Sequence, residues 1–130
     1  MGAYKGLGFS KISQELFWSI WKKIPKEIQT DCYFATNNKG KFQLDINREF
    51  TLTLPKGWAK LDFIIPSKNK WIEFDGEYWH NRQDQVEKDL KRSQEIFIHY
   101  PELQCKRVKE SDFRANPDKV ITECVDWLIL

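Results

Sequence analysis

The sequence predicts a mixed α/β domain in which a central sheet is covered by helices. Apolar residues recur at helical spacing near both ends of the chain and in residues 83–99. Residues 60–65 and 71–78 instead alternate apolar and polar side chains, as half-buried strands do. The order helix, strands, helix, strand, helix therefore predicts one α/β domain over residues 1–130.

The N-terminal part predicts an arm, a helix and several strands. Residues 1–9 are rich in glycine and predict a flexible arm. Apolar side chains at helical spacing predict an amphipathic helix over residues 11–24, which Pro25 ends. Strand-like stretches follow at residues 32–36, 42–46 and 49–54, and their pairing stays open.

The C-terminal part predicts a hairpin, two helices and one more strand. Residues 66–70 form a turn between the two alternating strands. The pattern of residues 83–99 is helical, since Val86, Leu90, Ser93 and Phe97 lie on one face. A short strand is expected at 103–108, and Asn116 caps a final helix that has Pro117 at its first position.

Length and composition favour a single packed domain. The chain has 130 residues, 41% of them hydrophobic, with nine Phe, six Trp and four Tyr. This length suits one core and not two, and large rings help a small domain to bury surface. The charge is divided: residues 1–60 hold ten basic and five acidic side chains (+5), and residues 61–130 hold eleven and fourteen (−3). Asymmetry of this size is common, so it supports a polyanionic partner only weakly.

Cysteine content and hydropathy predict a cytoplasmic protein. The three cysteines, Cys32, Cys105 and Cys124, form no C-x-x-C pair, which argues against a disulfide framework and a structural zinc site. No apolar run reaches about 18 residues, as a membrane span requires. The N-terminus also lacks a signal-peptide pattern.

The hairpin gathers acidic side chains on one face. If Pro66 lies opposite Trp71, Asp62 lies opposite Asp75, because directly opposite residues share a face. This register gives an apolar face made of Leu61, Phe63, Ile65, Ile72 and Phe74. It gives an acidic face made of Asp62, Glu73 and Asp75, with Glu77 farther along.

Clustered carboxylates of this kind suit a metal ion. Opposed carboxylates repel unless they hold a cation or share a proton, and their hard oxygens suit Mg²⁺ or Mn²⁺. Alternation alone is more typical of a solvated outer face. Gly76, which permits close approach, and the adjacent Trp79 and His80 shift the interpretation towards a site for phosphodiester hydrolysis.

The same residues resemble a known nuclease superfamily. Asp62, followed after a turn by Ile-Glu-Phe-Asp-Gly-Glu-Tyr-Trp-His at residues 72–80, resembles the core of the PD-(D/E)xK nucleases. Within them it is most similar to the branch of the very short patch repair endonuclease and related phage and intron homing endonucleases. Residues 8–18 and 107–113 add to a resemblance that covers roughly residues 8–128.

The resemblance implies a fold and an activity. The fold is restriction-endonuclease-like, with a mixed central sheet flanked by helices. The activity is Mg²⁺-dependent hydrolysis of double-stranded DNA, with Mn²⁺ as a substitute, leaving a 5′-phosphate and a 3′-hydroxyl. The setting is the cytoplasm of a bacterial or phage-infected cell. Target sequence, nicking or double-strand cutting, and a role in repair, intron mobility or restriction stay open.

The resemblance also implies roles for single residues. The metal ligands are Asp62, Glu73 and the Phe74 carbonyl, with Asp75 as a further candidate; His80 is the base, Asp89 orients it, and Glu15 is the first-helix glutamate. The superfamily places a lysine where this chain has Asp75, and the repair branch also lacks that lysine and uses histidine. His80 is therefore the expected base, and Lys91 is a candidate to supply positive charge from the helix.

Basic and aromatic residues supply candidate DNA contacts. They are Lys11, Lys56, Trp58, Lys60 and Lys91. A domain this small has limited room to read a long site, which favours a homodimer or a separate recognition domain. The alternative function is a catalytically inactive nuclease-fold module that binds DNA without cutting it.

Overall fold

A four-stranded sheet with the strand order β1–β4–β5–β6 forms the middle of the molecule. The computed structural model describes residues 11–34, 50–76 and 83–130. The strands are β1 (Tyr33–Phe34), β4 (Phe63–Ile65), β5 (Lys70–Asp75) and β6 (Gln104–Lys109). β4 pairs antiparallel with β1 and β5, whereas β5 and β6 are parallel. The expected mixed sheet of an α/β fold is thus confirmed.

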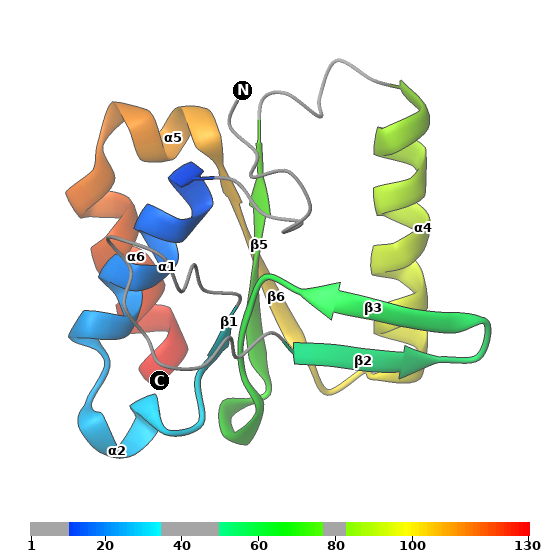
Figure 1. Cartoon of the computed structure of the whole chain (residues 1–130), viewed down its shortest axis with the longest axis horizontal. Helices are drawn as coiled ribbons and strands as arrows, with labels where there is room; N and C mark the ends of the chain where they lie inside the picture. The colour runs from blue at the N-terminus through cyan, green and yellow to red at the C-terminus, as the bar shows by residue number, and fades with distance from the viewer. Residues whose placement is uncertain (1–10, 35–49, 77–82) are drawn as a thin grey trace.

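Helices near the two ends of the chain cover one face of this sheet (Figure 1). They are α1 (Lys11–Lys23), α5 (Glu110–Ala115) and α6 (Pro117–Ile129), and the short α2 (Lys26–Gln29) follows α1. Their apolar side chains pack against the sheet in one buried cluster, which includes Leu16, Ile20, Phe63, Ile72, Cys124 and Leu128. The helical periodicity predicted α1 and α6 correctly.

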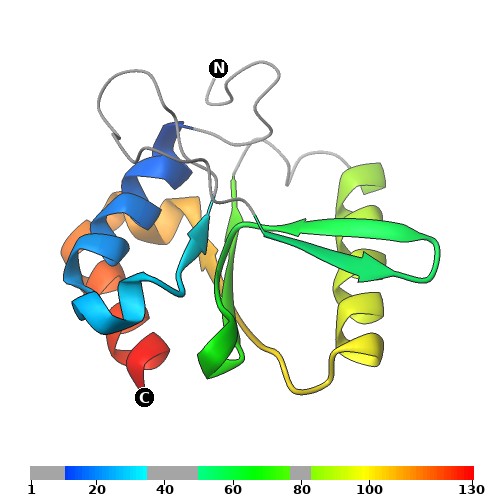
Figure 2. The ribbon, with the colours of Figure 1, turned by 60° about the horizontal axis from the view of Figure 1, so that its bottom comes forward.

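A long helix and a separate hairpin cover the other face (Figures 1 and 2). The helix is α4 (Gln83–His99), and the hairpin pairs β2 (Phe50–Leu54) with β3 (Gly57–Leu61). A second buried cluster joins them to the sheet through Leu52, Leu54, Ala59, Leu61, Ile64, Trp71 and Ile96. The Tyr100 hydroxyl also donates a hydrogen bond to the Thr53 carbonyl at 2.6 Å.

The strand predicted over residues 60–65 is two strands. The chain bends at Asp62, so β3 ends at Leu61 and β4 begins at Phe63. Because of this bend, Leu61 belongs to the cluster under α4 and not to the face of Phe63 and Ile65. The prediction that Leu61 shares their apolar face was therefore wrong.

The register of the predicted hairpin was wrong by two residues. Phe63 pairs with Ile72 and Ile65 with Lys70, whereas the prediction paired Pro66 with Trp71. The strand stops before Pro66 because Pro66–Lys68 forms a 3₁₀ turn, which Asn69 closes in the left-handed conformation (φ 53°). Since side chains alternate with a period of two, this shift keeps the residues of β4 and β5 on their expected faces.

The apolar spacing of α4 does not mark its buried face. Leu90 and Phe97 are 54% and 67% exposed, whereas Ile96 is buried against the second cluster. The helix instead turns Arg92 and Ile96, one helical turn apart, towards the sheet. Apolar periodicity failed because α4 covers a strand face that carries charge.

Several expectations lie outside the described residues. These are the arm at residues 1–9, the stretch at 42–46 and the end of the second hairpin strand at 77–78. Residues 49–54, whose pairing was open, contribute β2 of the hairpin. None of the helices in the described ranges is both long enough and apolar enough to span a bilayer.

Two isoleucines on α4 test the orientation of this helix. We expect Ile96→Ala to lower the free energy of unfolding by about 2–5 kcal/mol, because it opens a cavity in the second cluster. Ile98→Ala, the matched control at a position that is 67% exposed, should change it by less than about 0.5 kcal/mol. Urea denaturation measures both, and equal losses would contradict this orientation.

Candidate metal centre and active site

Asp62 is held at the bend between β3 and β4. Its Oδ2 accepts a hydrogen bond from the backbone N–H of Phe74 at 2.8 Å. Phe74 lies on β5, so this bond ties the bend to the neighbouring strand. The structure therefore uses the amide of Phe74 to orient the carboxylate, while a metal contact through the Phe74 carbonyl stays a prediction.

Glu73 lies beside Asp62 under α4. Only 6% of Glu73 is exposed. Burial raises its pKa to about 8, and the negative charge of Asp62 contributes to that rise. Burial likewise raises the pKa of Asp62 to about 6, against the opposing effects of the Phe74 amide and Arg92. The buried Glu73 and the half-buried Asp62 thus form a pair of carboxyl groups that resists carrying two negative charges.

Arg92 of α4 supplies positive charge to this pair. Its Nη2 donates a hydrogen bond to Oε1 of Glu73 in an ion pair. Burial acts to lower the pKa of Arg92, but the charges of Glu73, Asp62 and Asp89 outweigh it and raise the pKa overall. One arginine therefore faces three carboxyl groups.

Two polar atoms in the centre of this cluster have no hydrogen-bond partner in the part of the chain that the structure describes. They are Oε2 of Glu73 and Nε of Arg92, and both are buried. A buried polar atom without a partner costs about 1–3 kcal/mol, and more when it is charged. The second oxygen of Glu73 is thus a donor atom that the described side chains leave unused.

A second ion pair closes the side of the cluster at the edge strand β6. Nη1 of Arg107 donates to Oδ1 of Asp75 at 2.7 Å, and Nη2 of the same guanidinium donates to Oγ of Ser93 at 2.6 Å. Arg107 lies directly across from Glu73 in the parallel β5–β6 register. Arg107 therefore links the sheet to α4 and neutralises Asp75.

The predicted site residues separate into three groups. Asp62, Glu73 and Phe74 lie together, and Asp89 is close enough for its charge to act on Asp62. Glu15 is half-buried on α1, which covers the opposite face of the sheet. His80 and Glu77 lie outside the described residues.

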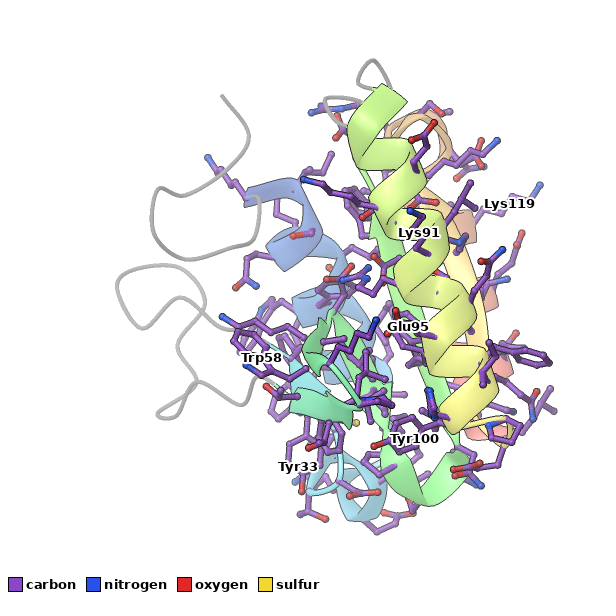
Figure 3. The ribbon with its side chains drawn as sticks, turned by 90° about the vertical axis from the view of Figure 1, so that its right-hand side faces the viewer. Tyr33, Trp58, Lys91, Glu95, Tyr100 and Lys119 are labelled. Carbon is purple, nitrogen blue, oxygen red and sulfur yellow. The ribbon has the colours of Figure 1, made fainter. Side chains whose placement is uncertain are left out.

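The candidate DNA contacts are exposed on three different elements. Lys11 is on α1, Lys56 and Lys60 are on the β2–β3 hairpin, and Lys91 is on α4. Trp58 is 64% exposed beside Lys60, whose Nζ lies 5.5 Å from the centroid of the indole ring. Figure 3 shows Trp58 and Lys91 on the hairpin and on α4, respectively.

The donor set fits a hard divalent cation. In the part of the chain that the structure describes, no group of three or more His, Cys, Asp or Glu side chains is placed to hold a metal ion. Mg²⁺, however, takes only one or two carboxylates and fills its other positions with water or phosphate oxygens. Asp62 and Glu73 provide two carboxylates, and the unpartnered Oε2 of Glu73 is available for such a contact.

Sequence reasoning missed both arginines of the site. Neither Arg92 nor Arg107 is among the site residues that the sequence analysis predicts. The helical spacing of Asp89, Arg92 and Ile96 would have placed all three on one side of α4. That signal is carried by charged residues, which a search for apolar stripes does not weigh.

Comparisons with known proteins add nothing to this description. No protein-family model, no curated protein and no solved structure matches the chain. Arguments about function therefore rest on the residues and their geometry.

The buried acid pair predicts an unusual pH dependence of stability. A carboxyl whose pKa is raised in the folded state keeps a proton that the unfolded chain releases. Without added metal, stability should therefore fall as the pH rises from about 4.5 through about 8, the range between the ordinary and the raised pKa of Glu73. Thermal unfolding measured across this range should show the decline.

Variants at Glu73 and Glu95 isolate the cause. Glu73→Gln should flatten the decline because it removes the group with the more strongly raised pKa. Glu95→Gln, at an exposed position of α4, should leave it as in the wild type. A decline that persists unchanged in Glu73→Gln would refute this assignment.

Proposed function

We propose that this chain is a metal-dependent DNA endonuclease with its active site at Asp62 and Glu73. The observation that carries the proposal is the pair formed by the half-buried Asp62 and the buried Glu73, in which one Glu73 oxygen has no partner among the described residues. Desolvation makes such a pair costly to keep, and a bound cation would offset that cost. The resemblance of residues 72–80 to the PD-(D/E)xK core supports the same function.

Asp62 and Glu73 would hold Mg²⁺ or Mn²⁺ from neighbouring strands. When bound, the cation polarises the phosphoryl group and lowers the pKa of a water molecule. The Phe74 amide fixes the rotamer of Asp62, so this carboxylate is oriented before substrate arrives. Asp75 already pairs with Arg107, which makes it the weaker candidate ligand.

Arg92 would take the place of the lysine that the superfamily motif carries. It reaches the acid pair from α4, whereas Lys91, considered from the sequence for this charge, is exposed. A guanidinium bound to Glu73 can hold this carboxylate in place and direct its remaining N–H groups at a phosphate. Asp89 adds negative charge beside it, and the roles of His80 and Glu15 stay predictions.

The substrate would be double-stranded DNA bound along the exposed basic residues. Lys56, Lys60 and Lys91 lie on the elements that flank the acid pair, while Lys11 lies on α1. Exposed lysines contact phosphates and position the duplex without reading its sequence. The proposal also includes assembly as a homodimer, a role in repair or homing, and a location in the cytoplasm of a bacterial or phage-infected cell.

One observation favours an inactive DNA-binding module as the second candidate. Glu73 and Asp75 each already have an arginine partner, Arg92 and Arg107. These two ion pairs neutralise part of the acidic charge without a metal ion. A chain that had lost its activity could keep its fold in this way.

Cleavage of supercoiled plasmid with Mg²⁺ or Mn²⁺ tests the proposal. We expect nicking or linearisation by the wild type and at least about a 100-fold slower reaction for Asp62→Asn, because this change removes a ligand carboxylate. Arg92→Met should slow the reaction by roughly 10- to 100-fold, since it removes the cation that orients Glu73. Gel electrophoresis over time measures all three rates.

Asp126→Asn serves as the matched control. Asp126 is an exposed acid on α6, on the opposite face of the sheet, so its change should leave the rate unaltered. DNA binding without cleavage by any metal would replace the proposal with the inactive module. Undiminished cleavage by Asp62→Asn would show that the acid pair is not the active site.

A further inference from the structure

The β2–β3 hairpin is firmly attached on its inner face, yet it exposes a tryptophan on its outer face. Leu52, Leu54, Ala59 and Leu61 are all buried against the second cluster. Trp58 nevertheless remains 64% exposed. Its exposure is therefore a property of an anchored hairpin and not of a loosely packed one.

The outer face of the hairpin combines an aromatic ring with hydroxyl groups and positive charge. Thr51 pairs across the strands with Lys60, and Thr53 with Trp58, and all four residues are exposed. The ammonium group of Lys60 lies 5.5 Å from the centroid of the Trp58 ring. Residues 50–61 contain Lys56 and Lys60 but no Asp or Glu. This surface is thus complementary in charge to a nucleic-acid strand.

We propose that this outer face, made of Thr51, Thr53, Trp58 and Lys60, binds an unpaired base of the nucleic-acid substrate. The base stacks on Trp58, and a phosphate of the same strand lies at Lys60. Stacking on an aromatic side chain tolerates any base because every base has a π face. The inference rests on the proposed function and adds to it that the substrate presents an unpaired base.

Trp58 is placed to act as a platform, that is, a fixed surface on which an opened base stacks. A base inside an intact duplex is covered on both faces by its neighbours, so it must leave the stack before it can meet the ring. Trp58 lies within β3 of the anchored hairpin, past the turn formed by Pro55 and Lys56, with the ammonium group of Lys60 beside its ring. It is therefore placed to receive an opened base.

β3, which carries Trp58, leads directly to the bend that holds Asp62. Trp58 precedes Asp62 by four residues, which corresponds to about 13 Å of extended chain. A stacked nucleic-acid strand advances about 3.4 Å per nucleotide. An unpaired base on Trp58 is thus within a few nucleotides of a phosphate at Asp62, and the platform selects substrates that are opened close to the cut.

Binding of a labelled single strand tests this inference without cleavage. The probe is a fluorescein-labelled oligothymidylate of about ten nucleotides, a length that one such surface accommodates, with Ca²⁺ replacing Mg²⁺. We expect Trp58→Leu to raise the Kd, measured by fluorescence anisotropy, roughly 5- to 150-fold. Phe97→Leu, which removes an exposed aromatic ring from α4, should leave the Kd unchanged.

A strand of the same length made of abasic sites separates stacking from charge. Trp58→Leu should bind it as the wild type does, because the phosphates remain and the bases are gone. Lys60→Met should weaken the binding of both strands and reduce the salt slope by about 0.7.

Three results would overturn the inference. The first is an unchanged Kd of Trp58→Leu for oligothymidylate. The second is an equal loss of affinity for the abasic strand. The third is a loss of self-association in Trp58→Leu, measured by sedimentation, which would make Trp58 part of an interface between two copies of the chain. Binding that depends on Trp58 in a protein that cuts no DNA would keep this inference and reject the nuclease. DNA cleavage by a protein whose strand binding does not depend on Trp58 would reject this inference and keep the nuclease.

Discussion

The structure of the candidate site depends on one arrangement, the burial of the Glu73 carboxylate beside Asp62 and beneath α4. Desolvation and like charge both oppose it, as the raised pKa values of the two groups show. Arg92 offsets part of this cost, but Oε2 of Glu73 has no partner among the residues in ranges 11–34, 50–76 and 83–130. A domain of 130 residues has little stability to lose. A functional role is therefore the simplest explanation for retaining a destabilising pair of carboxyl groups.

The rest of the fold serves this arrangement. The bend at Asp62 ends one hairpin strand and starts the central sheet, and the Phe74 amide fixes the carboxylate there. α4 carries Arg92 over the acids and Ile96 into the apolar cluster. The same helix therefore covers both the charged and the apolar parts of one sheet face. Arg107, on the edge strand β6, joins this strand to β5 through Asp75 and to α4 through Ser93.

The sequence was sufficient for the long helices and for the acid pair, but not for the shorter elements or for the surroundings of the pair. Alternation placed Asp62 and Glu73 on one side, and this survived a register error because the shift was by an even number of residues. The bend at Asp62 was not predictable, since it depends on a hydrogen bond to Phe74 across the sheet. The orientation of α4 was missed for a related reason: its inward side is chosen by ion pairing as well as by apolar burial.

Direct binding of Mn²⁺ is the measurement that tests the central claim most simply. Titration followed by electron paramagnetic resonance needs neither a DNA target nor turnover. The account predicts a site in the wild type whose affinity falls at least about tenfold in Asp62→Asn, because one of two ligand carboxylates is lost. Equal Mn²⁺ affinity in the two proteins would contradict it, and the acid pair would then be a structural feature held by Arg92.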